Sequence, residues 1–176
     1  MVIIKTERGM NMEKIVSVAQ YIYNEYKNIS GEDIDEMKLH KLLYLSQRES
    51  LAITGAPLFN EDFQGWMYGP VNLEVRKRFK NGTISKNVEK EISLEAAYIA
   101  KNIILQYGAY EPWKLSELSH NETSWKKSRE GIPNGVKGSN IINIDDIRED
   151  AKKVRPYDSV WDMYYDEFED YENMEG

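Results

Sequence analysis

Apolar residues recur with the period of an α-helix in the first part of the chain. After Met12 they occupy a single helical face, formed by Ile15, Val18, Ala19, Ile22 and Tyr26. Ser30–Gly31 ends this first predicted helix. A second helix is predicted from Asp35 to Thr54, because Asp35 suits a helix N-terminus and Gly55 is placed to end the helix.

The second predicted helix is apolar on more than one side. Leu39, Leu42 and Leu43 share one stripe, whereas Leu45 and Leu51 lie outside it. A helix with apolar residues on several sides has to be covered by its neighbours. We therefore predict that this helix lies at the centre of the fold.

Four aromatic residues, Phe59, Phe63, Trp66 and Tyr68, lie in the turn-rich segment 58–70. Each ring buries a large area when it packs, so we expect this segment to lie against the core, with a short extended piece over 63–68. Gly69 is expected to adopt a backbone conformation that other residues avoid. Pro70 is expected to begin the next helix in its first turn.

Shorter helical patterns follow at 71–81, 93–107, 112–119, 123–129 and 146–154. Thr123 or Ser124 can cap the helix at 123–129, Asp145 can cap the last one, and residues 141–144 are expected to be extended. The sequence therefore predicts a mainly α fold. It consists of a loose lead-in at 1–11, one compact multi-helix domain at 12–157 with a short irregular or two-stranded β element, and an acidic, aromatic C-terminal helix or tail at 158–176.

The net charge of −7 belongs to the end of the chain. From Asp158 to Gly176 there are eight acidic residues and neither Lys nor Arg, and the rest of the chain holds 22 acidic against 23 basic residues. A near-neutral body argues against general nucleic-acid binding, which needs a basic face.

Aromatic and acidic residues alternate in this last segment with helical spacing. We hypothesise that an amphipathic helix forms here, docks its aromatic stripe onto a partner protein and directs its acids to a basic surface of that partner. Alternatively, the segment folds back on the body or only aids solubility. The partner-binding candidates are Trp161, Tyr164, Tyr165 and Phe168 on the stripe, with Asp162, Asp166 and Glu169 on the other side.

Residues suited to catalysis or metal binding are scarce. The absence of cysteine excludes disulfides, thiolate zinc sites and cysteine nucleophiles. The only histidines are His40, which has no acid or histidine at metal-binding spacing and is assigned a structural role, and His120, assigned to a turn. No glycine-rich phosphate loop is present. We expect a protein that is not an enzyme and needs no metal or cofactor.

The N-terminus lacks the apolar core of a signal peptide, since Val2–Ile4 is followed at once by Lys5, and Met10 or Met12 could equally be the start. No apolar run reaches the ~18 residues needed to cross a bilayer. A cytoplasmic protein without a membrane partner is expected.

Two basic clusters, 76–80 and 126–129, lie on short predicted helices. The interpretation we favour is that both are solvated polar faces. If they converged in space, they could instead form a patch for nucleic acid or an acidic partner, or one of them could receive the acidic tail.

Three blocks together resemble the Panacea domain of SocA-like antitoxins and phage-associated GepA-like proteins. The first two are Lys-Leu-His-Lys-Leu-Leu-Tyr-Leu-Ser-Gln (38–47), followed by Gly-x-Pro-Leu-Phe (55–59), and Phe-Gln-Gly-Trp-Met-Tyr-Gly-Pro-Val (63–71). The third is Leu-Ser-His-x-x-x-x-Trp-Lys-Lys-Ser-Arg (118–129). The resemblance spans about residues 13–157. The motif positions, which we interpret as structural, are Leu39, Leu42, Leu43, Tyr44, Pro57, Leu58, Phe59, Trp66, Tyr68, Gly69, Pro70, Val71, Leu118, Ser119, His120 and Trp125.

This resemblance implies an antitoxin of a toxin–antitoxin system, which neutralises a cognate toxin protein by direct contact. It also implies one alternative, an adaptor that delivers the toxin to an ATP-dependent protease, as in SocA-like proteins. A further alternative is a phage-associated DNA-binding regulator that uses the two basic clusters. The family brings no catalytic activity or cofactor. Within the motif, residues 66–70 are interpreted as a packed corner more than as a binding site.

Overall fold

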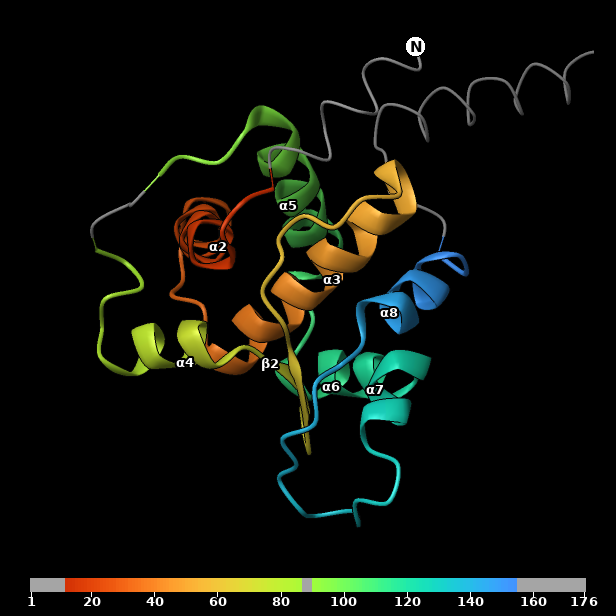
Figure 1. Cartoon of the computed structure of the whole chain (residues 1–176). Coiled ribbons are helices and arrows are strands. Elements are labelled where there is room, and N and C mark those ends of the chain that lie inside the picture. The colour runs from red at the N-terminus through yellow and green to blue at the C-terminus, as the bar shows by residue number, and fades with distance from the viewer. Residues whose placement is uncertain (1–11, 87–89, 155–176) are drawn as a thin grey trace, which may run out of the picture.

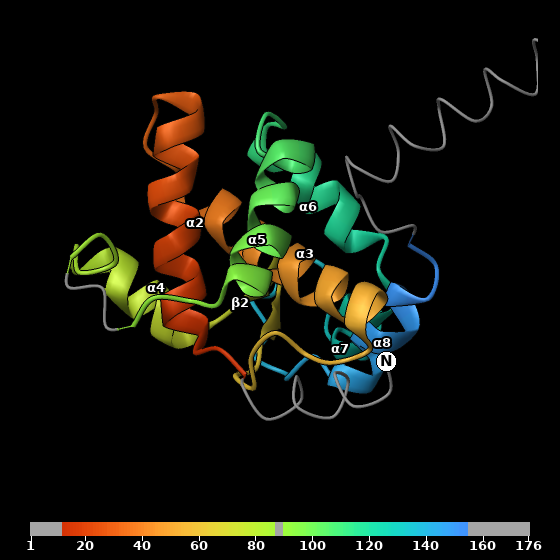
Figure 2. The ribbon, with the colours of Figure 1, turned by 90° about the horizontal axis from the view of Figure 1, so that it is seen from above.

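The computed structural model describes residues 12–86 and 90–154, which fold around one central helix (Figure 1). This helix, α3, packs against α2 and α5 on one side and against α6 and α8 on another, while α7 packs on α8 (Figures 1 and 2). The helices are α2 (Ile15–Ser30), α3 (Glu36–Thr54), α4 (Leu73–Lys80), α5 (Leu94–Tyr107), α6 (Pro112–His120), α7 (Thr123–Ser128) and α8 (Ile144–Ala151). The mainly helical prediction is confirmed.

The central position of α3 also agrees with its sequence pattern, because every residue from Lys38 to Leu51 is buried. Its two ends are fixed locally. The Asp35 side chain accepts a hydrogen bond from the Lys38 N–H at 2.8 Å, and Gly55 (φ 75°) donates its N–H to the Leu51 carbonyl at 3.0 Å. These are the N-cap and the left-handed C-cap that the residue types favour.

A β-hairpin follows α3 and carries the middle motif. Strand β1 (Gln64–Trp66) pairs antiparallel with β2 (Gly69–Val71), with Gly65 opposite Pro70. Pro70 therefore lies in a strand, and the expectation that it begins the next helix is wrong. Asn72 starts α4 instead, because its side chain accepts a hydrogen bond from the Val75 N–H at 3.0 Å and satisfies a donor at the helix N-terminus.

The segment before α8 lies along β1. The Gly65 N–H donates to the Asn140 carbonyl at 2.8 Å, and the Ile142 N–H donates to the Phe63 carbonyl at 2.8 Å. The predicted extended piece is correct at its start but ends early, because Ile144 already begins α8. Its cap is Asn143, whose Oδ1 accepts the Asp145 N–H at 2.8 Å, so the expected cap at Asp145 is wrong.

Helix α7 receives its N-cap from another helix. Both carboxylate oxygens of Asp150 in α8 accept backbone N–H groups, from Thr123 at 2.9 Å and from Ser124 at 2.8 Å. Neither Thr123 nor Ser124 caps the helix as the sequence suggested. Its own N-cap residue, Glu122, makes no capping hydrogen bond, so a side chain distant in sequence supplies the acceptors.

The motif residues of α3 hold the surrounding segments in place. The Gln47 amide donates to the Phe59 carbonyl at 2.8 Å, and its Oε1 accepts the Leu58 N–H at 2.7 Å. The Tyr44 hydroxyl lies 2.7 Å from the hydroxyl of Ser124, and the Tyr44 ring packs edge-on against Phe63 with centroids 5.8 Å apart. These contacts fix the position of the hairpin relative to α3.

Within the described ranges, none of the helices is both long enough and apolar enough to span a bilayer.

Candidate functional site

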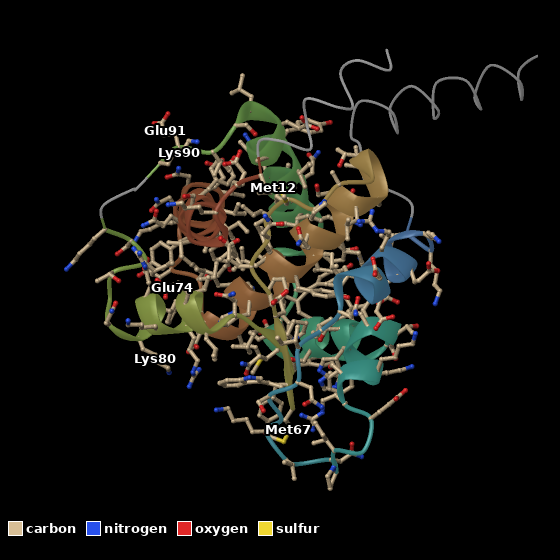
Figure 3. All side chains as sticks on the ribbon, viewed as in Figure 1. Met12, Met67, Glu74, Lys80, Lys90 and Glu91 are labelled. Atoms are coloured by element: carbon tan, nitrogen blue, oxygen red, sulfur yellow. The ribbon has the colours of Figure 1, made fainter. Side chains whose placement is uncertain are left out.

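The hairpin turn projects beside the loop at 131–140, and the Met67 N–H donates to the Lys137 carbonyl of this loop at 2.8 Å (Figure 3, where Met67 marks the turn). Its residues divide into two groups. Gly65, Gly69 and Pro70 are buried, whereas Trp66 is half-buried and Tyr68 is 58% exposed. The motif thus includes both a packed corner and an accessible aromatic surface.

The packed corner requires glycine at Gly69. Its φ of 123° lies in a region that other residues rarely adopt, as the sequence predicted. A Cβ at this position would also collide with the Lys41 ammonium and the Ser119 hydroxyl. A side chain here would therefore strain the backbone and displace the side-chain ends of Lys41 in α3 and Ser119 in α6.

A pocket of about 380 Å³ opens between the hairpin, the first turns of α3, α4 and the 131–140 loop. Its apolar walls come mainly from methionine, aromatic and valine side chains. Its polar groups are one carboxylate, one imidazole and three cations. The lining residues are Glu36, Met37, His40, Lys41, Trp66, Met67, Tyr68, Val71, Arg76, Gly135 and Lys137.

Trp66 forms one wall of this pocket between two cations. The Arg76 guanidinium carbon lies 5.0 Å from the ring centroid, and the Lys137 ammonium nitrogen lies 4.0 Å from it. The indole N–H donates to the Gln64 side chain at 2.9 Å. Cation–π contacts on this ring hold the two cations beside the pocket.

Lys41 brings an ammonium group into the interior beneath the hairpin. Its side chain is buried, and its Nζ donates to the carbonyl of Tyr68, which also accepts the Ser116 hydroxyl at 2.9 Å. Within the described part of the chain, Lys41 has no carboxylate at ion-pair distance. Burial lowers the pKa of the Lys41 amine to about 7, against the weaker attraction of Asp35.

Glu36 is the carboxylate of the pocket, and other groups already neutralise it. Its Oε1 lies 2.5 Å from Arg76 and 3.6 Å from the His40 Nε2, and its Oε2 lies 3.1 Å from Lys80. His40, Lys80 and Arg76 lower the pKa of Glu36 to about 2. Burial lowers the pKa of His40, so its imidazole is neutral near pH 7.

A second, more open hollow of about 610 Å³ adjoins the first, since Met37 and Tyr68 line both. Trp113 of α6 stands at this hollow and is 65% exposed. The rest of the lining is Pro112, Ser116, Glu117, His120 and Asn121. The two hollows give this side of the molecule a continuous aromatic and methionine-rich surface, which we call the hairpin face.

The third motif block supports the hairpin from behind. Trp125 donates its indole N–H to the Trp66 carbonyl at 2.9 Å, and its ring stacks on His120 with centroids 4.1 Å apart. The Ser119 side chain is buried and donates to the Ser116 carbonyl at 2.8 Å. Leu118 is half-buried against the core.

Motif residues of the first two blocks lie mostly in the interior. Pro57 and Val71 are half-buried. The buried ones are Leu39, Leu42, Leu43, Tyr44, Leu58 and Phe59.

The two basic clusters, interpreted as solvated polar faces, are each engaged in part by other residues of the fold. In the first, Arg76 and Lys80 are engaged by Glu36. In the second, Arg129 is buried and donates to the carbonyls of Lys137 at 2.7 Å and Val136 at 2.6 Å. The interpretation of 126–129 as a solvated face is therefore wrong at Arg129, because its guanidinium satisfies the backbone of the 131–140 loop.

The predicted partner-binding residues of the C-terminal segment, Trp161, Tyr164, Tyr165 and Phe168 with Asp162, Asp166 and Glu169, lie outside the described residues.

Sequence reasoning missed the polar groups of the pocket. The sequence assigns His40 a structural role with no acid or histidine at metal-binding spacing, although Glu36 lies one helical turn before it and the two side chains meet. It also passed over Lys41, which stands between His40 and Leu42 in a helix already predicted to be covered on several sides. A lysine in such a position has to be buried, and that was the available sign.

Two comparisons returned nothing: no curated protein and no solved structure shows significant similarity to the chain. Among protein families, residues 39–126, which make up half of the 176-residue chain, match the antitoxin SocA-like family, Panacea domain. The matched range runs from within α3 through the hairpin into α7 and contains Trp66, Tyr68 and Trp113 of the hairpin face, whereas Met37 and Lys137 lie outside it. The chain therefore belongs to the SocA-like antitoxin family and contains its Panacea domain.

Proposed function

We propose that this protein is an antitoxin that neutralises a cognate toxin protein by direct binding, without catalysis. Membership of the antitoxin family is the observation that carries the proposal. The partner is a toxin protein, and the fold supplies a rigid surface for it.

The hairpin face supports the proposal as a contact surface. Tyr68 and Trp113 expose more than half of their surface, and Met37 and Met67 lie beside them around the two hollows. Aromatic and methionine side chains are enriched at protein interfaces, and a few of them carry most of the binding energy. Contiguous exposed apolar surface on a folded domain favours an interaction site.

The acidic, aromatic segment 158–176 is the second proposed toxin contact. Its aromatic residues are Trp161, Tyr164, Tyr165 and Phe168, and its charge complements a basic toxin surface. Deleting residues 158–176 and repeating a toxin-rescue assay tests this contact. Reduced rescue by a truncated protein of normal stability supports it, and full rescue excludes it.

The main experiment is co-expression with the product of the adjacent gene. That product should arrest growth when expressed alone, and co-expression of this protein should restore growth. The two proteins should also co-purify in equimolar amounts after a salt wash. A neighbour that is harmless, or that never binds this protein, contradicts the proposal.

The lifetime of the toxin separates sequestration from proteolytic delivery. A bound and neutralised toxin keeps its half-life, whereas an adaptor for an ATP-dependent protease shortens it. We expect an unchanged half-life in a pulse-chase measurement. Arg76 and Lys80 already pair with Glu36, and the buried Arg129 donates to loop carbonyls, which weighs against the DNA-regulator alternative.

A further inference from the structure

Lys41 is an unusual group for a protein that only needs a stable core. Its ammonium is buried with one backbone acceptor and without a carboxylate at ion-pair distance among the described residues, yet it lines a pocket that opens to the surface. Burying a charge without a partner is costly. A ligand that supplied a negative group would remove that cost.

We infer that the pocket beside Lys41 binds a carboxylate carried next to an apolar side chain on the partner toxin. The inference rests on the proposed function and names the chemistry of its central contact. The carboxylate pairs with Lys41, and the adjoining apolar group packs between Trp66 and the methionines.

The charged residues that line the pocket favour an anionic ligand. Three cations line the pocket: Lys41, Arg76 and Lys137. Glu36 is the one acid among the lining residues, and Arg76 and Lys80 already pair with it. An incoming carboxylate therefore meets net positive charge, and Arg76 and Lys137 attract it toward Lys41.

The walls favour an apolar group beside the carboxylate. Met37, Trp66 and Met67 line the pocket, and its volume of about 380 Å³ lies in the range of ~300–1,000 Å³ typical of ligand sites. Methionine side chains adapt to the shape of what they contact. An aromatic or long aliphatic side chain fits this lining better than a fully polar ligand.

Continuity with the second hollow favours a protein as the source of the carboxylate. Met37 and Tyr68 line both hollows, so a group in the pocket lies next to the exposed Trp113 surface. A peptide segment can fill the pocket with one side chain and cover the neighbouring hollow with the next. A free small acid would leave that apolar surface open.

Binding should take up a proton above neutral pH. The free Lys41 amine has a pKa of about 7, and a bound carboxylate stabilises its charged form. Affinity should then fall by up to about tenfold per pH unit above pH 7. The charged and titratable groups that lie around Lys41 are Asp35, Glu36 and His40 of α3 and its N-cap, Arg76 of α4, His120 of α6 and Lys137 of the loop.

The first test is calorimetry of the full-length protein with the purified product of the adjacent gene at pH 6.5, 7.5 and 8.5. Lys41→Met should weaken binding at least tenfold at pH 6.5 and remove the decline with pH. The matched control is Lys77→Met, an exposed lysine of α4 outside the pocket, which should stay within about threefold of wild type. Wild-type affinity and pH dependence in Lys41→Met would overturn the inference while leaving the proposed function intact.

A second test does not need the toxin. Trp fluorescence should report millimolar binding of N-acetylphenylalanine, which has a free carboxylate, and much weaker binding of its amide, and Lys41→Met should abolish the difference. Equal binding of the two probes, or none of either, would exclude a carboxylate site.

A third variant identifies the occupant. In the full-length chain, Trp161, Tyr164, Tyr165 and Phe168 are changed together to Ser. Unchanged probe affinity supports an external partner. A gain of tenfold or more would show that this chain's own segment fills the pocket, and the assignment to the toxin would be wrong.

Discussion

At the scale of single residues, the buried Lys41 lowers the stability of the free protein and is also the residue proposed to contact the partner. Its neighbour, the Tyr68 carbonyl, also accepts the Ser116 hydroxyl at 2.9 Å. Removing the ammonium therefore leaves that carbonyl with a hydrogen-bond donor. The main effect of the removal is to relieve the cost of the buried charge, which stabilises the fold. A group that destabilises the fold without an obvious internal role is typical of a functional site.

Lys41→Met should stabilise the free protein by on the order of 2 kcal/mol at pH 6.5, measured by urea unfolding. In wild type, the folded pKa of about 7 lies below the unfolded value of 10.5, so the unfolded state binds more protons between these values. The free energy of unfolding of wild type should thus rise from pH 7 to pH 9, and this rise should be absent in Lys41→Met. A wild-type stability that stays flat or falls over this range would contradict the pKa shift.

Substituting Gly69 tests how much its backbone angle and its close packing contribute to stability. Gly69→Ala should cost more than about 2 kcal/mol, because φ is 123° and the new Cβ would collide with Lys41 and Ser119. Gly31→Ala is the control: its φ is 77°, but no atom lies within 4 Å of the added Cβ. It should cost only about 1 kcal/mol in the same unfolding experiment. Equal losses of stability in the two variants would mean that the backbone angle alone accounts for the cost of Gly69→Ala.

At the scale of elements, the molecule joins short helices through side chains that lie far apart in sequence. Helix α7 has six residues, too few to be stable alone, and depends on Asp150 of α8 for its N-terminal acceptors. Helix α3 likewise reaches the N-cap of α7 through Arg48, which pairs with Glu122. Burial raises the pKa of Glu122 to about 6, against the attraction of Arg48 and with a smaller contribution from Asp150.

Asp150→Ala should cost about 1–2 kcal/mol, because the N–H groups of Thr123 and Ser124 lose their acceptors. The loss should appear in hydrogen exchange as faster exchange of residues 123–128. Asp145→Ala, at an exposed position that caps no helix, should change stability by less than about 0.5 kcal/mol. A larger loss at Asp145 than at Asp150 would overturn this assignment of the cap.

At the scale of the whole molecule, one side of the fold gathers accessible aromatic residues from two elements. Tyr68 comes from the hairpin turn and Trp113 from α6, and the Tyr68 carbonyl bonds to Ser116 of the same helix. The surface is therefore fixed by the core beneath it. A preorganised surface of this kind loses less entropy on binding.

Tyr68→Ser combined with Trp113→Ser should abolish toxin rescue and weaken binding at least a hundredfold, while the melting temperature stays close to that of wild type. Both side chains are mostly exposed, so their loss should leave the core unchanged. Ile53→Ser, an exposed apolar residue in the last turn of α3, is the control and should rescue fully. Full rescue by the double variant would place the toxin contact elsewhere.

Local sequence by itself determined the helices and many of their ends. The apolar stripe of α2, the all-round burial of α3 and the glycines at Gly31 and Gly55 follow from helical periodicity and from the backbone freedom of glycine. The motif blocks determined the family, which the match over 39–126 confirms.

Only the tertiary structure decided which distant groups meet. Asp150 caps α7, Arg129 holds the 131–140 loop, and Lys41 lies under the hairpin, although nothing in the local pattern of these residues predicts their partners. Periodicity tells which positions share a face, because it depends on backbone geometry alone. Pairings between elements depend on how those faces pack, so the accessible side of the hairpin and the positive pocket beside it emerge only in the folded chain.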